Sequence, residues 1–324
     1  MRFPQGTPHL QNAKLSFVNF DNILHDAKVE RASKICGLIT IIYPDVTELL
    51  FLRQGEPVNA ARFTRNDRDI VPIREVIEKA KKSPVGTVSI HEVPDELLAM
   101  ILATFNTKPM FKDIDVAETS PDTFLEKLTS TKFSGFVELR RGVELSYVGF
   151  EEGKPTHGYF AGRAGNEVSD EIMQKYLALQ DSEGGSIKVS GFEVTPERIE
   201  QATPALISLF LKMINAMIAE YGTLVGPALA EKTLHSSREA AAKQFSLLTD
   251  FVIDKDLTVS GEPLASPDDL SRAFAAWTDL LVDAFRAVLG DRAEEVFARS
   301  TKDFRFALKS TTFSEHSKLS KLLE

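Results

Sequence analysis

Apolar and polar residues follow the same order along two separate stretches of the chain. Residues 37–63 and 135–160 each contain two β-prone runs, a tight turn and a third run. Both stretches keep their sterically special residues at one offset of 98 positions (135 − 37 = 98): Gly37 with Gly135, Gly55 with Gly153, and Pro57 with Pro155. Apolar positions match at the same offset. The pattern therefore predicts an internal duplication.

The turn between the second and third runs is the most specific part of the repeat. Gln54-Gly55 and Glu152-Gly153 stand where a two-residue hairpin turn needs positive φ, which glycine adopts without a steric penalty. Pro57 and Pro155 follow at once, and proline suits a strand start or an edge strand. These four residues, Gly55, Pro57, Gly153 and Pro155, are predicted to define the turns.

The flanks of the two hairpins also match. Helical periodicity covers residues 73–82 and 169–179, and each helix precedes a short alternating strand, at 86–90 and 185–189. A proline followed by acidic residues then predicts a helix start in each copy, at residues 93–96 and 195–197. Each copy is thus a mixed module of roughly a hundred residues, a common domain size.

These signals predict an α+β fold with two tandem duplicated α/β modules, small antiparallel sheets and an all-α C-terminal domain. The expected boundaries are an N-terminal extension at 1–17, module one at 18–105, a linker at 106–119, module two at 120–195 and a helical domain at 196–324. In module two, Val137 and Leu139 alternate with Glu138 and Arg140, which predicts a sheet with one face in water.

The helical domain has clear helix boundaries. Ser266-Pro267 predicts the start of its best-marked helix and Gly290 its end. Residues 251–264 lose the helical period and predict a small β excursion or a loop, a further helix is expected from 291 to about 308, and the polar tail is expected to fray. The most apolar window, residues 205–219, is shorter than the roughly 20 residues that cross a bilayer, which favours a core helix.

Composition narrows the class of protein. Of the 324 residues, 43% are hydrophobic and 26% charged, as in ordinary globular domains. A net charge of −9 argues against general nucleic-acid binding, which needs a basic surface. Because Cys36 is the only cysteine, the chain cannot form an intrachain disulfide. The N-terminus lacks the apolar core of a signal peptide. We therefore expect a cytoplasmic protein that does not enter membranes.

Motifs for chemistry do not emerge from the sequence. The six histidines are scattered without metal-ligand spacing, and neither phosphate-binding loops nor a GxSxG elbow occur. Residues 162–165 form a GxxG that is more often a plain connection than a nucleic-acid clamp. We predict no catalytic residues, no cofactor and no metal. Asn59 and His157, at equivalent positions of the third strands, and Arg163 are the candidates for an interaction surface.

Residues 150–158, which run from Phe150 through Gly153 to His157-Gly158, resemble the core of the PATAN-type module of bacterial signalling proteins. In that module a strand ends in Phe-x-x-Gly and a histidine and a small residue follow. The resemblance covers about residues 120–195 and, more loosely, 20–105, where Leu52 and Asn59 depart from the motif. The whole chain also resembles an uncharacterised family of archaeal proteins that begin with MRFPxGxP. The resemblance implies protein–protein interaction in signalling or motility and supplies no catalytic residues.

Two hypotheses follow, and a third, an enzyme of unrecognised type, is weaker. The first is a non-enzymatic interaction or scaffold protein with unknown protein partners, in which the helical domain is the candidate for homodimer formation. The alternative is a small-molecule sensor whose apolar pocket lies in the helical domain and is lined by Phe210, Met213, Met217 and Trp277. Residues of these types at helical spacing are more often plain core.

Overall fold

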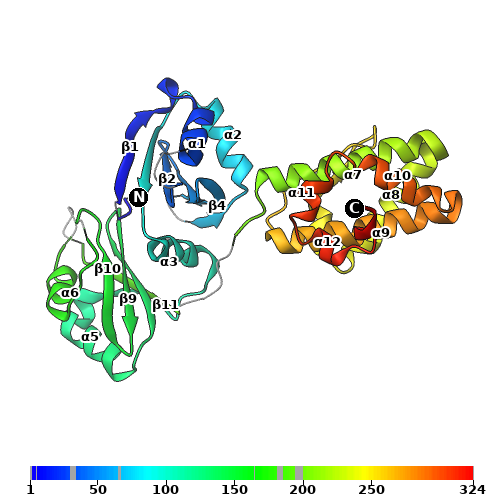
Figure 1. The fold of residues 1–324 in the computed structure, drawn as a ribbon. Helices are drawn as coiled ribbons and strands as arrows, with labels where there is room; N and C mark the ends of the chain where they lie inside the picture. The colour runs from blue at the N-terminus through cyan, green and yellow to red at the C-terminus, as the bar shows by residue number, and fades with distance from the viewer. Residues whose placement is uncertain are drawn as a thin grey trace. The chain divides into compact units, whose positions relative to one another are not determined.

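The computed structural model describes residues 2–4, 6–29, 34–64, 67–163, 165–180, 185–193 and 200–323. The chain forms two compact units (Figure 1). Unit 1 comprises Met1–Val71 and Glu75–Ile199 and contains both predicted modules, and unit 2 comprises Pro72–Arg74 and Glu200–Glu324. The predicted helical domain, 196–324, therefore begins within a few residues of the observed boundary.

Module one is an antiparallel sheet of six strands with three α-helices. Its strands lie in the order β1-β6-β2-β3-β4-β5. The elements in chain order are β1 (Thr7–Lys14), the 3-10 turn η1 (Leu15–Phe17), α1 (Phe20–Val29), β2 (Gly37–Ile42), β3 (Thr47–Arg53), β4 (Glu56–Phe63), β5 (Arg68–Ile70), α2 (Ile73–Lys82), β6 (Thr87–Glu92) and α3 (Asp95–Asn106).

Module two repeats this arrangement with five strands. Its strands lie in the order β7-β11-β8-β9-β10, which matches β1-β6-β2-β3-β4 strand for strand. The elements are β7 (Phe111–Asp115), α4 (Val116–Thr119), α5 (Pro121–Ser130), β8 (Gly135–Arg141), β9 (Glu144–Glu151), β10 (Lys154–Tyr159), α6 (Asp170–Leu177) and β11 (Lys188–Phe192). The tandem α+β modules predicted from the sequence are confirmed. The predicted second proline-led helix start, at 195–197, lies outside the described residues.

The predicted turn residues occupy the same conformation in both copies. Gln54 and Gly55 have φ values of 50° and 77°, and Glu152 and Gly153 have 47° and 82°. Both turns pack closely on the preceding helix, because a Cβ on Gly55 would lie 2.4 Å from the carbonyl oxygen of Ala27. Each of the two hairpins has a β-bulge next to its proline, beside Pro57 in β3–β4 and beside Pro155 in β9–β10. Proline has no backbone N–H to donate, and a bulge is a position where the strand can do without that hydrogen bond.

The predicted extension and linker are wrong in one respect, since each contains the first strand of its module. Residues 7–14 form β1 and residues 111–115 form β7. Both strands bulge at an equivalent residue with positive φ, Asn12 (50°) and Asp113 (52°). The backbone N–H of Asn12 donates to Ser89 Oγ (2.9 Å), and that of Asp113 donates to Ser190 Oγ (3.0 Å). The duplication therefore includes these strands.

The N-terminal segment connects the two modules of unit 1. Arg2 forms a parallel bridge with Glu144, its N–H donating to the carbonyl oxygen of Val143 (2.7 Å). The buried ring of Phe3 contacts that of Phe63 edge to face, with 5.3 Å between centroids. Arg2 and Phe3 of the MRFPxGxP segment thus have a structural role here: Arg2 pairs with the strand of one module and Phe3 packs on the core of the other.

The expectation of a wet face on the module-two sheet is also wrong, because both faces are covered. One face packs on α5 and α6 through Val137 and Leu139. The other face shares a core with α3 and module one, so that α3 lies between the two sheets (Figure 1). Glu138 is 4% exposed on that inner face, and its carboxylate accepts two hydrogen bonds from the Arg68 guanidinium, each 2.7 Å.

Unit 2 is a helical domain with one small hairpin. Its elements are α7 (Pro204–Val225), α8 (Pro227–Ala242), η2 (Ser246–Asp250), β12 (Val252–Ile253), β13 (Val259–Ser260), α9 (Pro267–Leu289), α10 (Arg292–Ser300), α11 (Arg305–Lys309), α12 (Phe313–His316) and η3 (Ser320–Leu323). The Ser266 hydroxyl caps α9, and Gly290 ends it with φ 61°, as predicted. The side-chain amide of Asn215 holds the hairpin through the backbone of Val259 (2.7 and 3.0 Å).

Two expectations for unit 2 need correction. The single helix predicted for 291–308 is divided into α10 and α11, and the tail does not fray. Leu319 and Leu323 are buried in the core, and the Asp279 carboxylate accepts hydrogen bonds from the Ser317 hydroxyl (2.7 Å) and the Lys318 N–H (3.0 Å). The polar composition of the tail conceals these anchors.

Helix α7 is a core helix, as its apolar stripe predicts. Seven of its residues are buried: Ile207, Phe210, Met213, Ile214, Met217, Ile218 and Tyr221. With 22 residues it is longer than the predicted window, and by length and composition alone it is the one described helix that could also cross a membrane. Core helices of soluble proteins have the same properties, and the buried face is accounted for by packing within unit 2.

Candidate functional site

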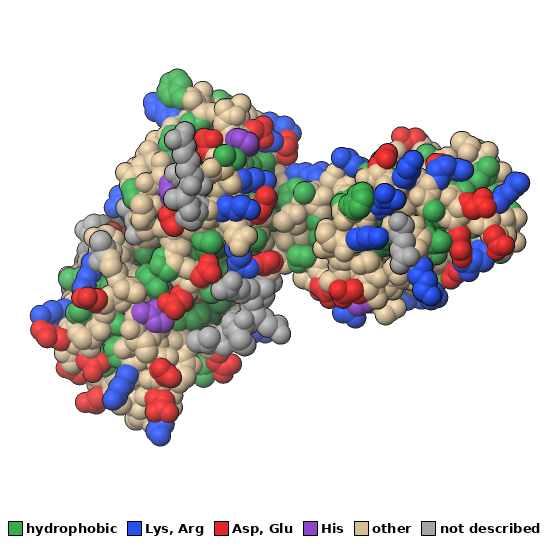
Figure 2. All heavy atoms as spheres, in the orientation of Figure 1, with side chains coloured by type: hydrophobic (Ala, Val, Ile, Leu, Met, Phe, Trp, Pro, Cys, Tyr) green, Lys and Arg blue, Asp and Glu red, His purple; other side chains and the backbone are tan. Residues whose placement is uncertain are grey.

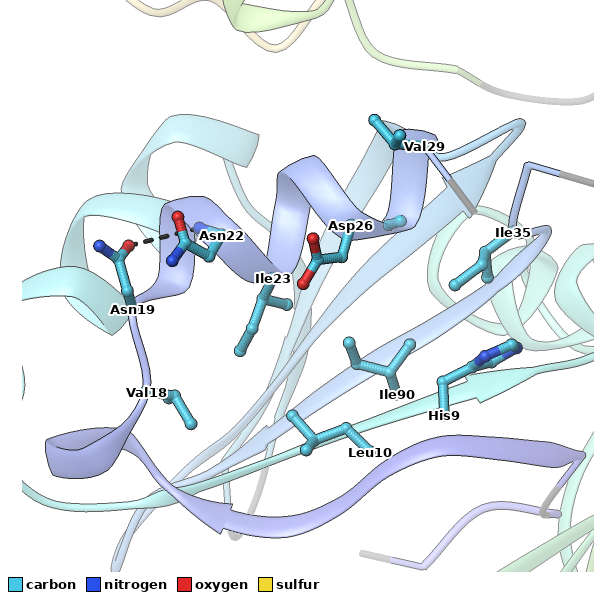
Figure 3. A pocket seen from close by; sticks show the side chains of 11 residues that line it. His9, Leu10, Val18, Asn19, Asn22, Ile23, Asp26, Val29, Ile35 and Ile90 are labelled. Carbon is cyan, nitrogen blue, oxygen red and sulfur yellow. Dashed lines mark hydrogen bonds between the residues drawn. The ribbon is translucent and has the colours of Figure 1, made fainter. Parts of the chain in front are cut away.

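A groove between β1 and α1 of module one is the candidate functional site. It is an open depression of about 660 Å³ (Figure 3). Its lining comes from β1, the residues before α1, α1 itself, β6 and Ile35 shortly before β2: His9, Leu10, Val18, Asn19, Asn22, Ile23, Asp26, Ala27, Val29, Ile35 and Ile90.

The groove has an apolar floor and a polar rim. Ile23, Ile35 and Ile90 form the floor and are all less than 9% exposed. Asp26 on α1 and His9 on β1 stand on opposite walls (Figure 3). An apolar floor with a few polar groups at its rim is the usual composition of a binding surface.

The rim groups are positioned by local structure. The Asn19 side chain accepts hydrogen bonds from the N–H groups of Asp21 (2.9 Å) and Asn22 (3.3 Å), and thereby caps the start of α1. His9 Nε2 lies 3.3 Å from the Glu92 carboxylate. Burial and the neighbouring His9 lower the pKa of His91, the residue beside Glu92 on β6, which favours its neutral form.

The equivalent seam of module two is filled by aromatic rings. Phe111 on β7 lies directly over Gly191 of β11, where an added Cβ would come within 2.1 Å of the ring. The Phe111 ring packs against Phe124 of α5 (6.1 Å between centroids) and against Phe133 (5.8 Å).

Aliphatic residues occupy these positions in module one. At an offset of 101 residues (111 − 10 = 191 − 90 = 124 − 23 = 101), the counterparts of Phe111, Gly191 and Phe124 are Leu10, Ile90 and Ile23. Strand pairing confirms the match, because Leu10 pairs with Ile90 as Phe111 pairs with Gly191. The counterpart of Phe133 is Ile35 (133 − 35 = 98). Module one therefore has aliphatic side chains at all four positions, with Ile90 where module two has a glycine, and these side chains line the groove.

The prediction that Asn59 belongs to an interaction surface is wrong. This residue is fully buried, and its side-chain oxygen accepts a hydrogen bond from the Ala60 N–H (2.8 Å), so it cannot form part of a surface. It does occupy the position equivalent to His157, as predicted, because both residues lie beside the bulge of the third strand.

His157 is partly buried, with 26% of its side chain exposed, and lies on the strand face above Gly149. A Cβ on Gly149 would come within 2.4 Å of the imidazole, so glycine is what allows the ring to lie there. Its Nδ1 is 2.9 Å from Thr156 Oγ1 and its Nε2 is 3.8 Å from the Glu96 carboxylate of α3. The ring borders an open depression of about 670 Å³ that also includes Glu151 and Glu193.

Arg163 borders a different depression. That one measures about 680 Å³ and includes Pro4, Leu97 and Tyr159. The Tyr159 hydroxyl donates to Glu96 (3.1 Å), and burial together with Glu96 raises the pKa of Tyr159 to about 12, so the phenol stays protonated. The structure therefore does not bring His157 and Arg163 together in one site.

The four residues of the alternative pocket are all fully buried in unit 2. Phe210 stacks on Phe274 (4.9 Å), and the Trp277 indole N–H donates to Ser237 Oγ (3.2 Å). Met213 and Met217 belong to the same core. These side chains are thus packed against protein atoms.

Charged groups in the described part of unit 1 form structural pairs that the sequence did not reveal. Glu48 on β3 is fully buried and pairs with Arg62 (2.6 Å) and Lys79 (2.8 Å), which ties α2 to the sheet. Among the described residues, no group of three or more His, Cys, Asp or Glu side chains is arranged to hold a metal ion.

Comparisons with known proteins give little information. No protein-family model matches the chain, and no curated protein is similar to it at a significant level. A solved structure of the Helicobacter pylori β clamp in complex with 3,4-difluorobenzamide aligns over 59% of this chain and 66% of the clamp chain. The identity is 10% and the TM-score 0.15, too low to carry an argument about fold or function.

Proposed function

We propose that this chain is a non-enzymatic interaction protein that binds a protein partner through the groove of module one. The observation that carries the proposal is the difference between the two copies at one seam. Module two closes the seam with Phe111, Phe124 and Phe133, whereas module one leaves it open over an apolar floor. The two modules share one fold, so the packed seam of module two serves as the comparison against which the groove of module one stands out as a binding surface.

The charge distribution agrees with a protein partner. On the face shown in Figure 2, acidic and basic side chains of the described residues are interspersed, without the large single-sign field that nucleic-acid binding needs. The net charge of −9 disfavours nucleic acid as the partner. A role in signalling or motility, as the PATAN-type resemblance implies, and a cytoplasmic location are part of the same proposal. The sensor alternative is less favoured, because its pocket residues are fully buried.

A matched pair of proteins tests the proposal. The double variant Leu10→Phe/Ile90→Gly transfers the Phe111/Gly191 arrangement of module two into module one, so that one aromatic ring replaces two of the aliphatic side chains that line the groove. Tagged wild-type chain and this variant are used in parallel to capture proteins from cells of the source organism, and each captured protein is then purified and titrated against both. We expect a partner that binds wild type and not the variant. Partners that bind both equally would refute the groove as the binding site.

A further inference from the structure

The groove lies beside the most exposed large hydrophobic side chain of the described residues. Phe17, at the end of η1, is 82% exposed, and Val18, the next residue, lines the groove. The groove's far rim carries another exposed apolar residue, Val29 (59%). The module-two counterpart of Phe17 is Glu118 (118 − 17 = 101), a charged residue next to a seam that is already filled. The exposed ring and the open seam thus occur together in one module, and neither occurs in the other.

A surface that carries a projecting ring beside a cavity for a ring is complementary to itself. Two copies related by a two-fold axis can each insert the ring into the groove of the other, since the same patch forms both sides of an isologous interface. An aromatic ring is a fitting occupant, because rings pack against one another at the equivalent seam of module two.

Charge around the two features fits the same pairing. The Lys14 ammonium lies 5.9 Å from the centroid of the Phe17 ring and would accompany it. Asp26 is exposed on the groove wall, where the described residues supply no ion-pair partner for its carboxylate. Insertion of Phe17 would bring a lysine of one copy toward an aspartate of the other.

We propose that the module-one groove receives Phe17 of a second copy of this chain, so that the protein forms a two-fold homodimer through module one. This inference rests on the proposed function of the groove as a protein-binding surface. It differs from the sequence-based expectation, which placed homodimer formation in the helical domain.

The test is sedimentation equilibrium of the full chain over a series from about 1 to about 100 µM, in which weak homodimers dissociate. We expect wild type to dimerise and Phe17→Ser to weaken the dimer roughly 100-fold, because two ring insertions are lost per dimer. Phe17 is exposed, so this variant folds. Leu10→Phe/Ile90→Gly should be monomeric as well. Val288→Ser removes a similarly exposed apolar side chain, 58% exposed, from unit 2 and should leave the dimer unchanged.

Mixing the two monomeric variants gives a further readout. The F17S variant keeps the wild-type groove and the Leu10→Phe/Ile90→Gly variant keeps Phe17, so the mixture should form a heterodimer with one of the two insertions. A wild-type monomer throughout the series overturns the inference, and so does a dimer that Phe17→Ser leaves intact or that Val288→Ser abolishes. A monomeric wild type whose groove still captures another protein would reject the homodimer and retain the proposed function.

Discussion

The ion pair between Arg68 and Glu138 gives the sharpest prediction about stability. The two guanidinium–carboxylate hydrogen bonds are both 2.7 Å and join β5 of module one to β8 of module two. The Glu138 side chain is 5% exposed and that of Arg68 is 23% exposed. Removing Arg68 leaves a buried carboxylate with the Tyr147 hydroxyl (3.2 Å) as its remaining side-chain donor among the described contacts. An uncompensated buried charge of this kind costs about 3–5 kcal/mol.

For Arg68→Met we expect the lower end of that range, about 3 kcal/mol, because water reaches the edge of the guanidinium. At an m-value of about 2 kcal/mol/M this lowers the urea midpoint of unit 1 by about 1.5 M. The chain offers separate probes, since the only tryptophan, Trp277, lies in unit 2 and four of the five tyrosines lie in unit 1. Tyrosine emission and far-UV circular dichroism should shift, and Trp277 fluorescence should not.

Two further variants test whether Arg68→Met destabilises unit 1 by leaving the Glu138 charge buried or only by removing contacts. Adding Glu138→Gln to Arg68→Met removes the buried charge, keeps an acceptor for Tyr147 and should recover most of the lost stability. Arg140→Met on the same strand breaks the exposed pair with Asp113 (35% and 42% exposed) and should cost no more than about 1 kcal/mol. A loss below about 1 kcal/mol for Arg68→Met, or a double variant as unstable as the single one, would refute the reasoning.

Three other predictions concern local features. Gly55→Ala places a Cβ at a positive φ and against the backbone of Ala27, so it should lower the free energy of unfolding in urea by well over about 1 kcal/mol. Gly162→Ala also has a positive φ but open space around its Cβ, so it should lower it by only about 1 kcal/mol. Equal losses for the two variants would show that the clash at Gly55 has no effect. Burial raises the pKa of Asp279, against its hydrogen bonds from the tail, so the folded state holds this proton more tightly than the unfolded one. The stability of unit 2 should therefore fall as the pH rises through that raised pKa, and Asp279→Asn should lack this component when Trp277 fluorescence is followed. Leu323→Ala, in the docked tail, should destabilise unit 2 by about 2–5 kcal/mol, and a loss near zero would mean that the tail does not support the core.

Local sequence signals were sufficient wherever one residue type satisfies one backbone requirement. Gly55 and Gly153 were found because a hairpin turn needs positive φ, and both adopt it. The Ser266 cap and the Gly290 helix end were found for similar reasons. Each of these signals lies within a few residues of the feature that it predicts, so no tertiary knowledge was required.

The first strand of each module was missed because nothing in its own sequence alternates clearly. Residues 7–14 are mostly exposed, and a bulge at Asn12 breaks the period of two. The buried face of β8 was missed for a different reason. Glu138 reads as a solvent-facing residue, and its partner, Arg68, is 70 positions away. Only the packing of the two modules on each other determines that this carboxylate is buried.

The groove was missed because the repeat does not keep one offset. The hairpins of the two modules align at an offset of 98 residues, whereas β1, α1 and β6 align with their counterparts at an offset of 101. A comparison at the single offset of 98 therefore does not match Leu10 with Phe111 or Ile90 with Gly191. A search that allowed a three-residue insertion would have placed phenylalanine against leucine at this position. That substitution is the signal that the sequence contained.

The two modules differ by exchanges across paired strands rather than by isolated substitutions. Leu10–Ile90 in module one corresponds to Phe111–Gly191 in module two, and Phe51–Asn59 corresponds to Gly149–His157. In each module-two pair a ring lies over a glycine, which conserves packing on the sheet because the glycine yields the space that the ring takes. The first exchange replaces two aliphatic side chains by a ring over a glycine, and the second replaces the buried Asn59 by the partly exposed His157. Since each exchange keeps the fold and changes the local surface, the two modules present different surfaces on the same framework, and this difference is the basis of the binding surface proposed for module one.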